Sequence, residues 1–436
     1  MSQPDSCTAD IAVRHYRRNL GLVVADHIVY TLGMTFLGAA TILPALVLRL
    51  GGGPLAVGMM STLQAAGWVL PQLVASRYMA GRALVKRTML GAALVARAAL
   101  WLALPALVLL GPAQPGVALA ALLLCTSAFT LLDSFSITGW FEILHKLVPA
   151  DQRGRVIGGA QSLANLVSLG AGFLVQLLLA AVLPFPLSYA AVLALSATFY
   201  SIDAACLGLL REPPSRASEE QRLPWQAYAS RLRRILRSDR RFTWLVVVSW
   251  LMGMADMAAA FYAVYATGPM GLPPEFLGLL ITASVAGGMV GSAAMGALGD
   301  RKGWVWTVRA VTVVRCLCPA LALLAPLAAG LVPWAGALCF VAAFALMGLL
   351  NAANYIVLTN YLLHIAPAGQ GAVYVALHSA LQAPRIVAPL MAGWMVQALS
   401  FPILFMVSLA LGLGAVAASA RSPRGPAAKV VDLAAT

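Results

Sequence analysis

Residues 296–303 read Gly296-Ala297-Leu298-Gly299-Asp300-Arg301-Lys302-Gly303 and lie between two long apolar runs. A carboxylate, two cations and three glycines stand within eight residues. Such a segment is costly in hydrocarbon, because charges and irregular backbone both lose their water there. The stretch is therefore predicted to be a turn at a membrane surface, and the other elements can be counted outward from it.

The composition favours a membrane protein. The chain has 436 residues, of which 61% are hydrophobic and 10% are charged, whereas soluble domains carry about 25% charged residues. Apolar runs of about 20 residues are long enough to cross a bilayer. Twelve such runs are predicted to be spans: 20–48, 56–76, 88–110, 115–139, 156–182, 188–210, 243–266, 276–298, 306–330, 333–361, 372–397 and 402–420.

The net charge of +14 is unevenly distributed along the chain. Arginine and lysine gather before the first span, after the second, fourth, eighth and last spans and in 211–241, whereas the alternate loops hold almost none, Arg49 being the exception. This bias places both termini in the cytoplasm. Because the cations follow the membrane topology, nucleic acid is not expected as a partner.

The two halves of the chain repeat with a shift of roughly 220 residues, which indicates an internal duplication. Pro54 and Gly58 before span two match Pro274 and Gly278 before span eight, and Arg97 in span three matches Arg315 in span nine. The predicted organisation is a cytoplasmic N-terminus (1–19), a six-helix bundle (20–210), a basic cytoplasmic linker (211–242), a second bundle (243–420) and a cytoplasmic tail (421–436).

The pattern Gly-x-x-Gly-Asp-Arg-x-Gly at 296–303 resembles the loop signature of the major facilitator superfamily, and Pro149-x-x-x-Arg153-Gly154-x-x-x-Gly158 resembles another of its loops in bacterial members. The resemblance implies an all-α integral membrane protein with twelve transmembrane helices in two pseudo-symmetric six-helix bundles. It also implies a multi-pass protein of the bacterial cytoplasmic (inner) membrane.

The first-half copy of the signature is degraded, because Ala80 stands where the aspartate would be. A gating role is therefore expected of the second-half loop alone. A carboxylate at a cytoplasmic helix end can hold the inner side closed through contacts with cations and helix termini. The expected gating residues are Gly296, Gly299, Asp300, Arg301 and Gly303.

Ionisable side chains inside spans are the main candidates for function, because each is costly to insert into a membrane. By the resemblance, spans one, four, seven and ten line the central cavity. A proton-coupling or substrate-binding role is therefore predicted for Asp26, His27, Asp133, Asp256, Asn351, Asn354 and, in span eleven, Arg385. Asp256 lies about 21 Å along its helix, near mid-membrane, which suits a carboxyl that takes up and releases a proton. The alternative for each is a hydrogen-bonded packing contact.

Two polar stripes are predicted on single helix faces. Gln161 and Asn165 belong to span five, and His378 and Gln382 belong to span eleven next to Arg385. They are expected to serve substrate binding or gating between the bundles. By contrast, Arg97, Arg315 and Asp203 are expected to be structural, because the resemblance puts their spans on the outside of each bundle. Arg97 and Asp203 lie at similar depth and are expected to pair.

The predicted function is secondary active transport of a small organic solute by alternating access, coupled to protons, with export favoured and hence antiport. An uncoupled facilitator and a proton-symport uptake permease are alternatives, and a non-transporting membrane sensor or assembly partner is a further one. The expected partners are the solute, protons and membrane lipid, with a functional monomer. The sequence resembles no phosphate-binding loop, nucleophile elbow or zinc cluster, so no enzyme activity, cofactor or metal is expected.

Overall fold

The computed structural model describes residues 6–79, 82–214, 235–236, 239–366 and 371–422. Every regular element in these ranges is helical. Among the described residues, ten helices are long and apolar enough to cross a membrane. The predicted spans 56–76 and 372–397 lie on helices outside these ten, α3 and the interrupted α14–α15. The number twelve therefore stays a prediction, while the all-α membrane class is confirmed.

The chain divides into two compact units. Unit 1 comprises Met1–Glu220 and Pro273–Thr282, and unit 2 comprises Gln221–Leu272 and Ala283–Thr436. The segment 273–282, which the sequence analysis assigns to the second bundle, clusters with unit 1. Most of the predicted linker 211–242 and of the tail 421–436 lies outside the described residues.

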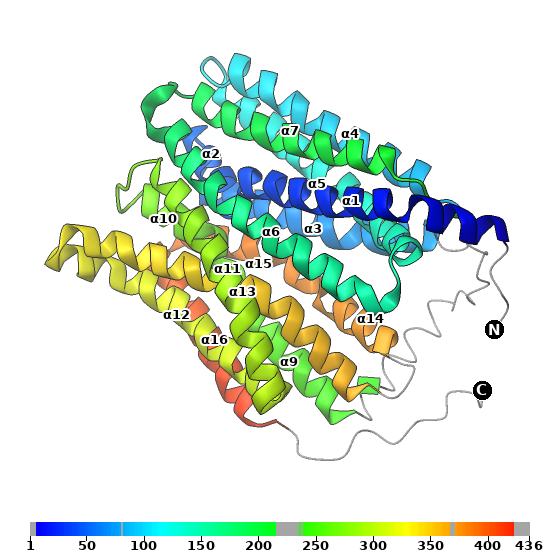
Figure 1. Cartoon of the computed structure of the whole chain (residues 1–436). Coiled ribbons are helices and arrows are strands. Elements are labelled where there is room, and N and C mark those ends of the chain that lie inside the picture. The colour runs from blue at the N-terminus through cyan, green and yellow to red at the C-terminus, as the bar shows by residue number, and fades with distance from the viewer. Residues whose placement is uncertain (1–5, 80–81, 215–234, 237–238, 367–370, 423–436) are drawn as a thin grey trace. The chain divides into compact units, whose positions relative to one another are not determined.

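Unit 1 contains seven described α-helices before residue 220, shown from blue to green in Figure 1. They are α1 (Ser6–Leu37), α2 (Ile42–Arg49), α3 (Pro54–Met79), α4 (Lys86–Pro105), α5 (Pro115–Leu147), α6 (Ala150–Leu177) and α7 (Leu187–Leu209). Single π-helical turns follow two of them, η1 (Ala106–Leu110) and η2 (Leu178–Val182). Helix α1 packs on α6 and α7, while α4 packs on α5 and α7.

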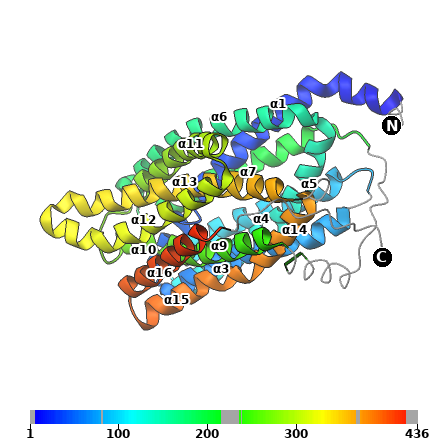
Figure 2. The ribbon, with the colours of Figure 1, turned by 90° about the horizontal axis from the view of Figure 1, so that it is seen from below.

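Unit 2 contains the remaining described helices, shown from green to red in Figure 1. They are α9 (Arg240–Ala255), η3 (Asp256–Ala258), α10 (Ala259–Thr267), α11 (Phe276–Lys302), α12 (Trp304–Leu331), α13 (Pro333–Ile365), α14 (Gly371–Gln382), η4 (Ala383–Val387), α15 (Ala388–Ala398) and α16 (Phe401–Ala420). Helices α12 and α13 lie side by side in both views (Figures 1 and 2). The first residues of α11 belong to unit 1.

Two predicted spans of unit 2 are interrupted helices. The 3₁₀ turn η3 separates α9 from α10 and begins at Asp256, and the 3₁₀ turn η4 separates α14 from α15 and contains Arg385. Short 3₁₀ segments inside a helix often mark hinges or functional positions. Both interruptions therefore fall on residues that the sequence singles out.

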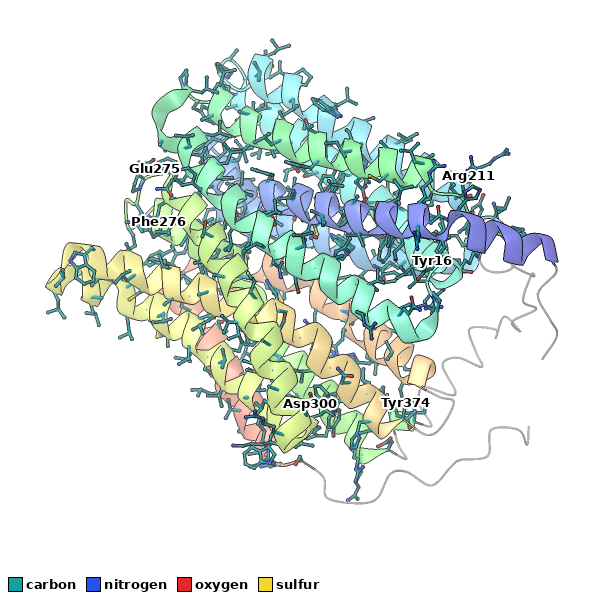
Figure 3. The ribbon with its side chains drawn as sticks, in the orientation of Figure 1. Tyr16, Arg211, Glu275, Phe276, Asp300 and Tyr374 are labelled. Atoms are coloured by element: carbon teal, nitrogen blue, oxygen red, sulfur yellow. The ribbon has the colours of Figure 1, made fainter. Side chains whose placement is uncertain are left out.

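The stretch 296–303 differs from the predicted turn. Residues 296–302 form the end of helix α11, where Figure 3 labels Asp300, and only Gly303 leaves the helix. Gly303 has φ +85°, a left-handed conformation that glycine adopts without steric cost. A Cβ at Gly299 would meet the ring of Trp304. The chain therefore reverses at one residue, and position 299 before the reversal needs a small residue to make room for Trp304.

Side-chain packing fixes the four helices that carry the polar site of unit 1. Val23, Met89, Ile143 and Leu207 belong to one buried apolar cluster and come from α1, α4, α5 and α7 respectively. Gly33 lets α1 approach α7 closely, because a Cβ there would lie 3.0 Å from the ring of Tyr200. In a membrane such close contacts hold helices together, since lipid is as apolar as the side chains.

Candidate functional site

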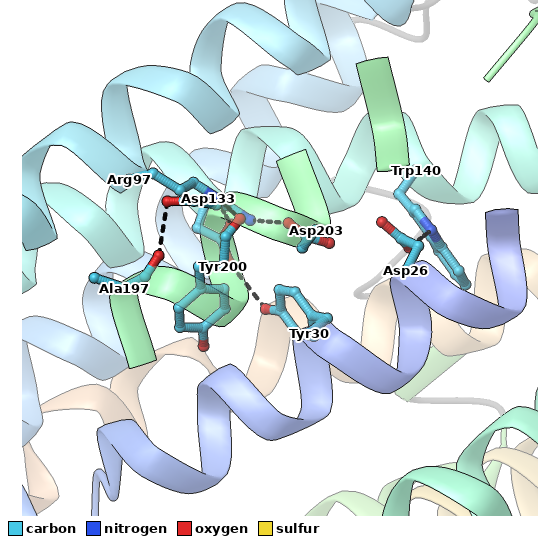
Figure 4. A network of polar contacts seen from close by, with 9 residues as sticks. Asp26, Tyr30, Arg97, Asp133, Trp140, Ala197, Tyr200 and Asp203 are labelled. Carbon is cyan, nitrogen blue, oxygen red and sulfur yellow. Dashed lines mark hydrogen bonds and ion pairs between the residues drawn. The ribbon is translucent and has the colours of Figure 1, made fainter. Parts of the chain in front are cut away.

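A network of polar contacts in unit 1 is built around the guanidinium group of Arg97, which is buried on α4 (Figure 4). Its Nη1 donates to the carboxylate of Asp133 on α5, and its Nη2 donates to that of Asp203 on α7. Its Nε donates to the main-chain oxygen of Tyr200 at 3.2 Å. The predicted pairing of Arg97 with Asp203 is confirmed, and Asp133 shares the same cation.

Asp133 is held on its other side by helix α1. The hydroxyl of Tyr30 donates to Asp133 Oδ2 at 2.8 Å. The side chains of Asp133, Asp203 and Arg97 are at most 4% exposed. Charges so deeply buried are tolerated only when they are paired and hydrogen-bonded. Helices α4, α5 and α7 of unit 1 are thus joined by ion pairs, and α1 is joined to them by the hydrogen bond from Tyr30.

Asp26 lies close to this centre but has a different partner. It is 2% exposed, and its Oδ2 accepts a 2.7 Å hydrogen bond from the indole Nε1 of Trp140. Its Oδ1 is buried with no hydrogen-bond partner in the described part of the protein. Figure 4 shows the carboxyl group of Asp26 facing that of Asp203. Asp26 and Asp203 can hydrogen-bond to each other only when one of the two carboxyls holds a proton, and with both ionised Asp26 Oδ1 receives no donor from the described residues.

A cavity of about 130 Å³ adjoins these groups. Both Asp26 and the Arg97 centre contribute to its wall, together with aromatic and aliphatic side chains. The lining residues are Asp26, His27, Tyr30, Arg97, Asp133, Ser136, Ile137, Trp140, Phe141, Asp203 and Leu207. The structure thus brings three of the predicted residues, Asp26, His27 and Asp133, to one hollow in unit 1.

The polar stripe of helix α6 begins beside this cavity. His27 Nε2 and Gln161 Oε1 are 2.9 Å apart, and Gln161 Nε2 donates to Asn165 Oδ1 at 2.9 Å. His27 is therefore joined to α6 by a short hydrogen-bonded chain. This chain connects the cavity wall to the predicted stripe, whose role in substrate binding or gating stays a prediction.

Unit 2 contains a second buried arginine centre with different partners. Arg315 Nε donates to Asp256 Oδ1 at 2.7 Å, and its Nη2 donates to Asn354 Oδ1 at 3.0 Å. The Asp256 side chain is 39% exposed, whereas that of Arg315 is 3% exposed. Asp256, Arg315 and Asn351 line a cavity of about 90 Å³ within this unit. The carboxyl group of Asp256 therefore borders a cavity that is large enough to hold water molecules.

Span eleven contacts helix α9 through a chain of polar groups. His378 Nε2 lies 3.0 Å from Ser249 Oγ and 3.2 Å from Gln382 Nε2. Arg385 Nη1 donates to Gln382 Oε1 at 2.6 Å and to the main-chain oxygen of Ser249 at 3.2 Å. The carboxylates of Asp256 and Asp133 are bound by Arg315 and Arg97 respectively.

Arg97, Asp203 and Arg315 were expected to be structural, on spans that pack on the outside of each bundle. All three line a cavity, a position that was not predicted, and their structural role stays a prediction. The useful signal was the similar depth of Arg97 and Asp203. An arginine and a carboxylate at one depth indicate a paired site, and Asp133 and Asp26 complete it. The expected gating residue Asp300 is exposed at the end of α11, and its role stays a prediction.

The comparisons with known proteins agree with this architecture. The family model described as Major Facilitator Superfamily matches residues 27–340. A bacterial homologue of the iron transporter ferroportin, in an inward-facing state, has a TM-score of 0.71 at 15% identity, covering 93% of this chain and 99% of the other.

Two further solved structures have the same fold. The nucleoside transporter NupG has a TM-score of 0.69 at 12% identity, covering 92% of this chain and 100% of the other. The fucose:proton symporter FucP of E. coli has a TM-score of 0.57 at 16% identity, covering 94% and 100%. A search of the curated proteins gives no match.

Proposed function

Because the chain belongs to the major facilitator superfamily, we propose that it is a secondary active transporter that moves a small organic solute by alternating access and couples this movement to protons. The observation that carries the proposal is the arginine–carboxylate centre buried beside a cavity in each unit. Ionisable groups inside spans are expensive, so their presence beside cavities favours a role in binding cargo or ions.

Asp256 is the carboxyl to which we assign proton exchange in unit 2. It is the partly exposed member of its ion pair, so a proton can reach it from the cavity. Protonation would remove the attraction of Asp256 to Arg315 and free that guanidinium for other contacts. This gives a physical link between proton binding and rearrangement of the centre. Asn351 and Asn354 then supply uncharged polar groups beside the cavity and the ion pair.

Asp300 and its neighbours are proposed to hold the cytoplasmic gate. Arg301 and Lys302 occupy the last turn of α11, where the helix dipole favours cations. The same dipole disfavours Asp300 at that position. Because the dipole of its own helix disfavours the carboxylate of Asp300, we expect this carboxylate to be stabilised by a cation or a helix N-terminus outside α11. We further propose that the protein works as a monomer in the bacterial cytoplasmic membrane and exports its cargo.

The test uses purified protein in vesicles that contain a pH-sensitive dye. We expect at least one solute from a panel of amino acids, nucleosides, sugars and amines to change the internal pH when it is added outside. Asp256→Asn should abolish this change, because an amide cannot carry the proton. Glu142→Gln is the matched control, since Glu142 is an exposed carboxylate on α5.

Two outcomes would contradict the proposal. Solute flux that persists in Asp256→Asn and ignores a proton-collapsing agent would identify an uncoupled facilitator. Ligand binding without flux of any solute in the panel would identify a sensor or assembly partner. A pH change whose sign shows protons and solute moving together would retain proton coupling and replace export by uptake.

A further inference from the structure

The charges around the cavity of unit 1 do not balance. Asp26, Asp133 and Asp203 carry three carboxylates, and Arg97 is the one arginine or lysine among the described residues that line the cavity. Arg97 is already shared by Asp133 and Asp203. An uncompensated carboxylate in an apolar interior is strongly unfavourable, so it must take up a proton or a bound cation. The imbalance is centred on Asp26, the carboxylate to which Arg97 makes no ion pair.

We propose that this cavity binds a compact organic monocation, with its ammonium group hydrogen-bonded to Asp26 Oδ1. This assignment names the substrate class of the proposed transporter. That the cation is transported rests on the proposed function, whereas its binding does not. The binding itself follows from the geometry of unit 1. Asp26 Oδ1 is a buried acceptor without a partner in the described residues, and its residue lines the cavity.

The orientation of Asp26 is already set before a ligand arrives. Trp140 holds Oδ2 at 2.7 Å, which leaves Oδ1 as the acceptor for a donor in the cavity. An ammonium group offers N–H donors and a positive charge, and charge-assisted hydrogen bonds are about twice as strong as neutral ones. A neutral hydroxyl could donate to Oδ1 but would leave the charge uncompensated.

The size and walls of the cavity favour an organic cation over an inorganic one. Its volume of about 130 Å³ is close to that of an engineered protein cavity of about 150 Å³ that binds benzene. Trp140, Tyr30 and Phe141 supply aromatic surface, which attracts organic cations, and Leu207 and Ile137 supply apolar surface. No group of three or more metal-ligating side chains that could hold a metal ion is found among the described residues.

Protons compete with this cation for Asp26. The titratable and charged groups around Asp26 come from every helix that lines the cavity. They are His27 and Tyr30 on α1, Arg97 on α4, Asp133 on α5, and Asp203 and Cys206 on α7. Protonation of Asp26 removes the charge that the ammonium group needs. One site then holds either a proton or the cation, which is the relation that an exchanger requires and which agrees with export.

The experiment measures the thermal stability of the full-length protein in detergent with propylammonium chloride as the probe. A ligand that binds the folded state raises the unfolding temperature with concentration. We expect saturable stabilisation by propylammonium, stronger at mildly alkaline than at mildly acidic pH, and little from propan-1-ol, propionate or sodium chloride. Asp26→Asn should weaken the apparent affinity by about tenfold or more, whereas Glu142→Gln should not change it.

A second variant keeps the test decisive if Asp26→Asn fails to fold. Trp140→Phe retains an aromatic ring and removes the hydrogen bond to Oδ2. It should weaken propylammonium binding, while propylammonium should still stabilise the protein more than propan-1-ol or propionate does. Equal stabilisation by propan-1-ol, or binding unaffected by both variants, would overturn the proposal. Because the assay needs no flux, binding without any solute-evoked pH change would leave this site standing and refute the transport function instead.

Discussion

At the scale of single residues, the two buried arginines differ in how fully they are satisfied. Arg97 donates from Nε, Nη1 and Nη2 to three different groups within unit 1. Arg315 donates from Nε and Nη2, while its Nη1 is buried without a partner in the described residues. Arg97 is thus a fixed counter-ion, whereas Arg315 retains a donor that a rearrangement or a ligand could use.

Replacing Arg97 with methionine should strongly destabilise the protein. The change leaves Asp133 and Asp203 buried without their cation, and breaking a buried ion pair in this way costs about 3–5 kcal/mol. The measurement is thermal unfolding of the purified protein in detergent. Arg87→Met is the matched control, because Arg87 lies on the same helix and is exposed.

A compensating variant separates the charge effect from lost packing. Adding Asp133→Asn and Asp203→Asn to Arg97→Met removes the unpaired charges, so most of the lost stability should return. If the triple variant is as unstable as Arg97→Met alone, the ionic account of this centre is wrong.

The candidate residues could be selected from the sequence, but their partners could not. Asp26, Asp133 and Asp256 stand out because a carboxyl in a span is costly. The direction in which a side chain points depends on the rotation of its helix, and one charge per span does not fix that rotation. The position of Arg97 and Arg315 in the cavity walls was therefore not predicted, although their shift of 218 residues marks them as counterparts in the sequence.

At the scale of elements, close contact between α11 and α13 depends on glycine. A Cβ at Gly348 would overlap the main-chain oxygen of Ser284, and one at Gly287 would overlap that of Ala345. Backbone cannot move aside as a flexible side chain can. Small residues that let helices approach in this way are a common basis of packing in membranes.

Gly348→Ala should therefore destabilise the protein by about 1–3 kcal/mol, the usual cost of overpacking. Gly330→Ala in α12 is the control, because nothing lies within 4 Å of a Cβ at that position. Thermal unfolding of both variants measures the difference. Equal unfolding temperatures would show that α11 and α13 are not packed as described.

Helices were readily predicted as elements, but their interruptions were not. Long apolar runs suffice to predict a span, since only helices satisfy their own backbone in lipid. The 3₁₀ turn at Asp256 has no proline or glycine within it. Directly before the turn, Ser408 Oγ donates a tertiary hydrogen bond to the main-chain oxygen of Ala255 at 2.6 Å. Such contacts leave no local pattern in the sequence.

At the scale of the whole molecule, the distribution of arginine and lysine predicts which loops face the cytoplasm. Alkaline phosphatase fused after Gln114 or Leu331 should be active, because those loops are predicted to be outside, and fusions after Lys302 or Thr436 should be inactive. A fluorescent-protein reporter should give the opposite pattern. Matching activity at Gln114 and Lys302 would contradict the orientation, because the five spans predicted between these positions must place them on opposite sides of the membrane.

The family could be inferred from the whole sequence, but the cargo could not. Duplication, span count and the charged signature are properties of the fold, and many transporters with different cargoes share them. The cargo depends on a few atoms, such as the free oxygen of Asp26. The accessibility of one oxygen is set by packing of α1 against its neighbours, and no periodicity in the sequence records it.

The anchoring of Arg97 has a consequence for bioenergetics. A guanidinium held by three acceptors cannot travel with the cargo, so the charge moved per cycle is that of the cargo and the proton alone. One monocation exchanged for one proton transfers no net charge across the bilayer. Such an exchange would be electroneutral, so the membrane voltage would not drive it. Of the two components of the proton-motive force, only the pH difference would.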